Sequence, residues 1–104
     1  MVCIIIYLEQ ANEAKELTDL LLMKRLIANA SIDKDNVSYN LKEGKIVENI
    51  NYVITAQTKM ALFYEIEELI AAAYGEHIPI FSIPIIHANH SFDTLIRSNT
   101  IPTT

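Results

Sequence analysis

Two histidines and an aspartate near the C-terminus have the residue types and spacing of a metal site. His87, His90 and Asp93 follow one another at intervals of three residues. If a helix begins near Asn89, His90 and Asp93 lie on one of its faces, and His87 reaches toward them from the end of a preceding strand. Imidazole and carboxylate ligands suit copper, zinc or nickel ions. The segment therefore predicts a divalent metal site, with a plain surface loop as the alternative.

A second group of side chains could hold a small anionic ligand. Tyr39 and Lys45 lie in a predicted hairpin, and they could face a cleft between subunits together with Lys59. Ordinary strand and surface positions are the alternative for these residues. His77 stands beside Glu76 and could titrate near neutral pH. Tyr39, Lys45 and His77 are the predicted ligand-binding residues.

The small numbers of cysteines and glycines exclude several kinds of site. Cys3 is the one cysteine, so the chain can form neither an internal disulfide nor a paired-cysteine zinc site, and a buried structural thiol is expected. Gly44 and Gly75 are the only glycines, too few and too far apart for a dinucleotide fingerprint or a P-loop. No nucleophile elbow is present either. We therefore expect a protein that is not an enzyme.

The charge and length of the chain limit its partners. Acidic residues outnumber basic ones by 13 to 8, giving a net charge of −5 at pH 7. Nucleic acid and anionic membranes attract basic proteins, so neither is an expected partner. No apolar stretch approaches the roughly 20 residues of a membrane span, and no signal-peptide pattern is visible, so a cytoplasmic location is expected. The 104 residues fit one domain.

Hydrophobic periodicity predicts four strands and three helices. In chain order these are a strand at Val2–Leu8, a helix from Asn12 to about Ala28–Ala30, strands at Val37–Leu41 and Asn49–Thr58 joined by a turn at 42–45, a helix ending before Gly75, an edge strand at Pro79–Ile86 and a short helix at about Ser91–Ser98. Thr58 is the predicted N-cap of the second helix.

This order, β-α-β-β-α-β followed by a short helix, predicts a mixed α/β (α+β) fold of the ferredoxin-like type. Such a fold has a four-stranded antiparallel sheet with both long helices on one face. The first and last strands are apolar enough to suggest that the other face is covered too. Because no element remains to cover it, we expect the chain to form an oligomer.

Several short stretches together give the sequence a resemblance to a known family. They are Arg25-Leu26-Ile27-Ala28, Ser38-Tyr39 followed by Gly44-Lys45-Ile46, the strand Tyr52–Thr58, Ile78-Pro79, Ile83-Pro84-Ile85 and Ile96-Arg97-Ser98-Asn99-Thr100. In order and spacing, from Val2 to Thr100, the chain resembles the CutA family of divalent-cation tolerance proteins. The resemblance implies a ferredoxin-like subunit in a tight homotrimer, with a cytoplasmic role in tolerance of copper and other divalent cations.

The chain departs from this family at the positions of its suspected metal ligands. Asn29 stands where the family has a cysteine, Tyr74 where it has a histidine, and Ile80 where it has a glutamate. Leu41 takes the place of an expected tryptophan. The resemblance therefore implies the fold and the trimer more directly than it implies a copper or zinc site. The alternative function is that of a PII-like regulatory trimer, which binds a small anionic metabolite between subunits.

Overall fold

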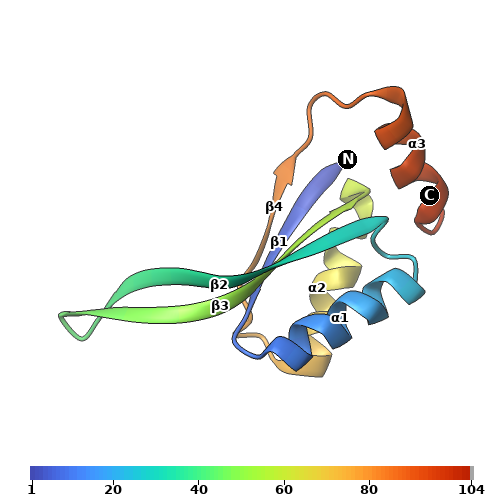
Figure 1. The fold of residues 1–104 in the computed structure, drawn as a ribbon. Coiled ribbons are helices and arrows are strands. Elements are labelled where there is room, and N and C mark those ends of the chain that lie inside the picture. Colours follow the sequence, from blue (N-terminus) through green and yellow to red (C-terminus); the bar gives the residue numbers. More distant parts are fainter. Residues whose placement is uncertain (104) are drawn as a thin grey trace.

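The structure is a computed structural model in which residues 1–103 are described. Its elements are β1 (Val2–Leu8), α1 (Ala11–Met23), β2 (Asn29–Lys42), β3 (Lys45–Thr58), a 3-10 turn η1 (Met60–Leu62), α2 (Phe63–Tyr74), β4 (Ile80–Pro84) and α3 (His90–Asn99). They form one antiparallel sheet in the order β2-β3-β1-β4. Both α1 and α2 lie on one face of the sheet, and α3 lies at the end near the N-terminus (Figure 1). The predicted ferredoxin-like fold is confirmed.

The central strand β1 builds the core through alternate side chains. Val2, Ile4, Ile6 and Leu8 are buried on the face that carries the helices. The helices contribute buried apolar side chains at helical spacing, and these are Ala14, Leu17, Leu21, Ile66 and Ile70. Because β1 pairs with β3 on one edge and β4 on the other, its backbone is hydrogen-bonded on both sides.

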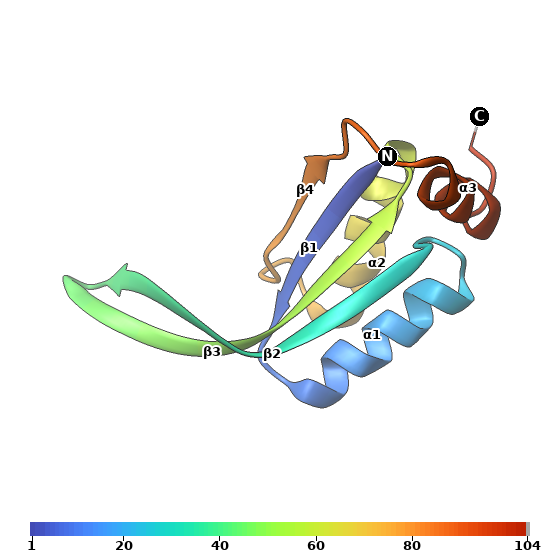
Figure 2. The same ribbon diagram turned by 45° about the horizontal axis from the view of Figure 1, so that its top comes forward.

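The opposite face of the sheet, here called the open face, has no helix over it (Figure 2). Cys3, Ile5 and Tyr7 of β1 point to this face and are only half-buried. Beside them on β4, Phe81 is 43% exposed and Ile83 50% exposed. The face that the sequence predicts to be covered is therefore uncovered in a single chain.

The β2–β3 hairpin extends well beyond the rest of the sheet (Figures 1 and 2). Each of its strands has 14 residues, whereas β1 has 7 and ends at Leu8, opposite Tyr52. The projection raises the radius of gyration to 14.6 Å, against about 13 Å for a compact chain of this length. The sequence predicts a strand only at Val37–Leu41, because the polar residues before it hide the first half of β2.

A β-bulge lies where the hairpin leaves the sheet. Asp33 pairs with Val53 and Asn36 with Asn51, so two residues of β2 oppose one residue of β3. Asp35 in the bulge has a φ of 60°, a left-handed conformation that Asp adopts more readily than most residues. A bulge bends its strand and increases the local twist, which turns the outer half of the hairpin away from the sheet.

Helix α1 ends earlier than the sequence predicts. It stops at Met23 instead of Ala28–Ala30, and Arg25 follows with a φ of 58°. The amide of Leu26 donates to Leu21 O and that of Arg25 to Leu22 O, which is the Schellman pattern of a helix end. Arginine takes the position that glycine usually occupies, so the stop signal is missing from the sequence.

Thr58 does not cap the second helix, and this prediction is wrong. The residue at the N-cap of η1 is Lys59, and the Thr58 side chain is fully buried. Its hydroxyl donates instead to the carbonyl oxygen of Leu26 at 2.5 Å. Thr58 thus fastens the end of β3 to the loop that follows α1.

Replacing Thr58 with valine should destabilise the fold. Thr58→Val keeps the shape of the side chain but leaves the buried Leu26 carbonyl without its donor, which should lower the free energy of unfolding by about 1–3 kcal/mol. Urea unfolding followed by circular dichroism, at a fixed protein concentration, measures the change. Thr55→Val, on the open face of the same strand, is the matched control, and equal losses in the two variants would contradict the role of the bond.

Candidate functional site

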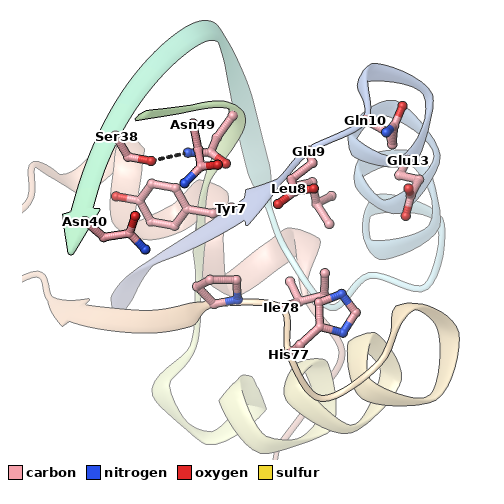
Figure 3. A pocket seen from close by; sticks show the side chains of 12 residues that line it. Tyr7, Leu8, Glu9, Gln10, Glu13, Ser38, Asn40, Asn49, His77 and Ile78 are labelled. Atoms are coloured by element: carbon pink, nitrogen blue, oxygen red, sulfur yellow. Dashed lines mark hydrogen bonds between the residues drawn. The ribbon is translucent and has the colours of Figure 1, made fainter. Parts of the chain in front are cut away.

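A polar hollow of about 470 Å³ opens where β1 ends (Figure 3). Four segments that are distant in the sequence surround it: the end of β1, the start of α1, the outer hairpin and the loop between α2 and β4. Its lining residues are Tyr7, Leu8, Glu9, Gln10, Glu13, Ser38, Asn40, Asn49, Asn51, His77, Ile78 and Pro79. The volume lies within the range of small-molecule sites, about 300–1,000 Å³.

The hairpin contributes hydroxyl and amide side chains to this hollow. Ser38 pairs with Asn49 in the register of β2 and β3, so the two side chains point to the same face. Asn51 is only 8% exposed, and its Nδ2 donates to Ser38 Oγ at 2.7 Å. Because Nδ2 takes part in that bond, Asn51 Oδ1 is left as an acceptor, and the structure shows no hydrogen bond to it within residues 1–103.

The charges around the hollow are acidic. Glu9 and Glu13 come from the turn into α1 and from its first turn, and Figure 3 shows them across the hollow from Tyr7 and Asn40. None of the twelve lining residues is lysine or arginine. The Tyr7 ring stacks on Phe81, with centroids 6.3 Å apart, so it is held in place on the open face. This arrangement favours cations and hydrogen-bond donors over anions.

His77 stands between this hollow and a second one. The second hollow, of about 540 Å³, is lined by Glu67, Glu68 and Glu76 together with the same loop. His77 packs over Gly75, where an added Cβ would come within 2.8 Å of Nδ1. Gly75 also has a φ of 105°, a backbone conformation that requires glycine.

The three predicted metal ligands do not form a metal site in one chain. Asp93 accepts a hydrogen bond from Arg97 Nε at 2.8 Å, and His87 and His90 are exposed. Within residues 1–103 there is no group of three His, Cys, Asp or Glu side chains that could hold a metal ion. Asn89 caps α3 by accepting from the Phe92 amide, as the predicted start of that helix requires.

The predicted ligand-binding residues are likewise separated. His77 lines the hollow, but Tyr39 is 66% exposed on the opposite face of the hairpin, and Lys45 lies beside the turn opposite Lys42. Strand alternation places Ser38 and Asn40, the neighbours of Tyr39, in the hollow instead. The sequence does not predict that Ser38 and Asn40 line the hollow. The other amide residues of the lining, Gln10, Asn49 and Asn51, are not predicted either, because all five are polar strand or loop positions without a motif.

Comparison with known proteins gives one family. The model of the CutA1 divalent ion tolerance protein family matches residues 2–99. The chain belongs to the CutA1 divalent ion tolerance family. Among curated proteins, none matches this sequence.

Solved structures of the family share the fold. A variant of CutA1 from Pyrococcus horikoshii superposes with a TM-score of 0.88 at 24% identity, covering 98% of this chain and 100% of that one. The periplasmic divalent cation tolerance protein CutA from Archaeoglobus fulgidus gives 0.85 at 26% identity, with 95% and 98% covered. CutA1 from Oryza sativa gives 0.91 at 16% identity, with 98% and 94% covered.

In this CutA1 chain, the positions where the resemblance implies metal ligands serve internal contacts. Asn29, in place of a cysteine, donates its Nδ2 to Gln57 Oε1 at 3.1 Å. Ile80, in place of a glutamate, packs against the core. Tyr74, in place of a histidine, lies where α2 faces α1: burial raises the pKa of its phenol above the ordinary 10.0, and the nearby charges of Glu16 and Glu13 raise it further.

Across residues 1–103, no helix combines the length and the apolar character that crossing a bilayer requires.

The raised pKa of Tyr74 predicts a pH-dependent contribution to stability. The fold favours the neutral phenol, so this contribution is complete below the unfolded value of 10.0 and is lost as the pH rises through the higher folded value. Tyr74→Phe removes the ionisable phenol, so the stability that the parent loses between pH 10 and the higher folded value should not be lost in the variant, and the stability of the variant relative to the parent should rise above pH 10.

Chemical unfolding between pH 8 and pH 11 measures the difference. The matched control is Tyr64→Phe, which removes an exposed hydroxyl from the same helix. A difference between the parent and Tyr74→Phe that stays constant over this range would contradict the raised pKa of Tyr74.

Proposed function

We propose that the chain acts as a non-enzymatic homotrimer in divalent ion tolerance and binds ions such as copper or zinc weakly. Membership of the CutA1 family supports the biological role. The observation that carries the assembly is an apolar surface that the single chain leaves uncovered, on the hairpin and on the open face of the sheet.

Five apolar side chains line one face of the projecting hairpin. Their exposed fractions are 42% for Val37, 66% for Tyr39, 72% for Leu41, 78% for Ile46 and 57% for Ile50. Val37 pairs with Ile50 and Leu41 with Ile46, so they form one continuous surface, here called the hairpin stripe. A monomer that exposed such a surface on a projecting ribbon would be prone to aggregate.

A symmetric assembly covers the hairpin stripe without any other partner. The hairpin projects beyond the body of its own subunit, so its stripe can only be buried by another chain (Figure 1). β2 and β4 are the edge strands of the sheet, and their outer edges are unpaired. Phe81 and Ile83 of β4 are exposed on the open face. Closed rotational symmetry would bury every copy of these surfaces at once.

The two C-terminal histidines are the proposed source of the metal affinity. His87 and His90 are both exposed, and neither takes part in a hydrogen bond that the structure records among residues 1–103. His90 is the first residue of α3, where the helix dipole opposes a bound cation. With only two imidazoles from each subunit, we expect weak binding, strengthened where further ligands come from another chain.

The PII-like alternative has little support. The absence of lysine and arginine from the lining of the polar hollow opposes an anionic metabolite there, and the comparisons do not favour it.

A charge on the hairpin stripe should break the assembly. The double variant Leu41→Asp, Ile46→Asp puts two carboxylates into the proposed interface, and the cost of desolvating them should convert a trimer into monomers. Sedimentation equilibrium at micromolar concentration measures the mass. Asn12→Asp, Ala72→Asp adds the same number of carboxylates at exposed positions of α1 and α2, away from the hairpin stripe and the open face, and should leave the trimer intact. A parent protein that sediments as a monomer would overturn the proposal.

Removing both exposed histidines should weaken metal binding. Calorimetric titration of the parent with Cu²⁺, Zn²⁺ and Ni²⁺ should show weak binding, and His87→Ala, His90→Ala should lower the affinity by about tenfold or more as two imidazole ligands are lost. His77→Ala is the matched control, because it removes an imidazole from a different surface. Unchanged affinity in the double variant would reject these ligands.

A further inference from the structure

Helix α3 and the residues that follow it, 100–103, are here called the C-terminal strap. We propose that the strap is a conformational device that detaches from the sheet and closes onto it again while the rest of the subunit stays folded. Among the other elements, α3 packs mainly against β3, so detachment uncovers the end of that strand. The motion depends neither on the assembly nor on metal binding.

Helix α3 buries little apolar surface. Ile96 is its one fully buried side chain, and it lies outside the main core cluster that β1, α1 and α2 form with the rest of the sheet. Phe92 is half-buried, and Leu95 is 37% exposed. A segment with few buried apolar contacts opens at a lower free energy than the core does.

The segment between β4 and α3 gives the strap room to move. The Ile85 amide donates to the Met1 carbonyl oxygen at 3.0 Å, which fixes the start of this segment beside β1. Residues 86–89, which follow, are all exposed and cross the end of the sheet near the N-terminus (Figure 1). Helix α3 has ten residues, which is too short for a stable isolated helix in water, so it melts when it detaches.

Two basic side chains hold the C-terminal end of α3 in place. Arg25 Nη2 donates to the Ser98 carbonyl oxygen at 2.8 Å, and Lys59 Nζ donates to the Ile101 carbonyl oxygen at 2.9 Å. The Ile101 amide donates in turn to the Arg25 carbonyl oxygen at 2.9 Å. Positive charge is favourable at a helix C-terminus. These three bonds, here called the latch, join the strap to the loop after α1 and to the end of β3.

Other hydrogen bonds of the strap lie within it. Arg97 Nε donates to Asp93 Oδ2 at 2.8 Å. The Thr100 hydroxyl is buried and donates to the Ile96 carbonyl oxygen at 2.7 Å. These bonds depend on the helical conformation, so they are lost together when α3 melts. The strap therefore opens and closes as one cooperative unit.

Hydrogen exchange of the assembled protein, followed by nuclear magnetic resonance, tests the proposal. The helical amides of Leu95–Asn99 should exchange at least tenfold faster than the amides of β1. Their rates should hardly change when urea is added below the unfolding transition, because opening of the strap exposes little surface. The amides of β1 exchange through global unfolding, so their rates should rise with urea.

Two variants locate the contacts that keep the strap closed. Lys59→Met keeps the apolar stem of the side chain but removes a charged donor of the latch, so the α3 amides should exchange about tenfold faster. Ile96→Val removes one methylene group from the buried contact, and about three- to tenfold faster exchange is expected. Exchange of the β1 amides should stay unchanged in both. Lys24→Met removes the same charge from an exposed residue beside Arg25 and should change neither.

Three results would overturn the proposal. The first is that the α3 amides share the exchange rates and urea dependence of β1, because the helix then opens only when the whole subunit unfolds. The second is that Lys59→Met and Ile96→Val accelerate exchange in β1 as much as in α3. The third is that Lys24→Met accelerates exchange in α3 as much as Lys59→Met does.

Discussion

The difference in length between β1 and its neighbour β3 determines most of what this chain presents to its surroundings. β1 stops at Leu8, while β3 continues outward for another seven residues, from Asn51 to Lys45, paired only with β2. Up to Leu8 the sheet has helices on one face and a compact core. Beyond it, both faces of the hairpin lack a neighbour, so one can carry the apolar hairpin stripe and the other can border a hollow.

The β-bulge in β2 decides which side chains take each of these roles. Asn29, Ser31 and Asp33 point to the open face, and an unbroken strand would continue this face through residues 35, 37 and 39. The extra residue of the bulge moves the pattern by one, so Ser38 and Asn40 border the hollow and Tyr39 joins the hairpin stripe. The one extra residue of the bulge thus determines which face of the outer hairpin is polar and which is apolar.

The sequence predicts the parts of the fold whose signals are local. β1 reads as a buried strand, the element order indicates the sheet, and the prolines place β4 at an edge. The end of α1 was predicted wrongly because Arg25 stands where a helix usually ends in glycine. The first half of β2 was not predicted because its residues on the open face of the sheet are polar. The hollow could not be predicted, because its polar side chains come from four separate segments and meet only through the register of the bulge.

The positions where the family resemblance implies metal ligands hold Asn29, Tyr74 and Ile80 in this chain. Asn29 donates to Gln57 across β2 and β3, and Tyr74 lies near the carboxylate of Glu16 on α1. The acceptors that remain open face the polar hollow, and the exposed imidazoles stand at the other end of the sheet, beside α3. A chain arranged in this way can keep the CutA1 architecture while its ligand chemistry changes, because the buried core of β1, α1 and α2 contains none of these residues.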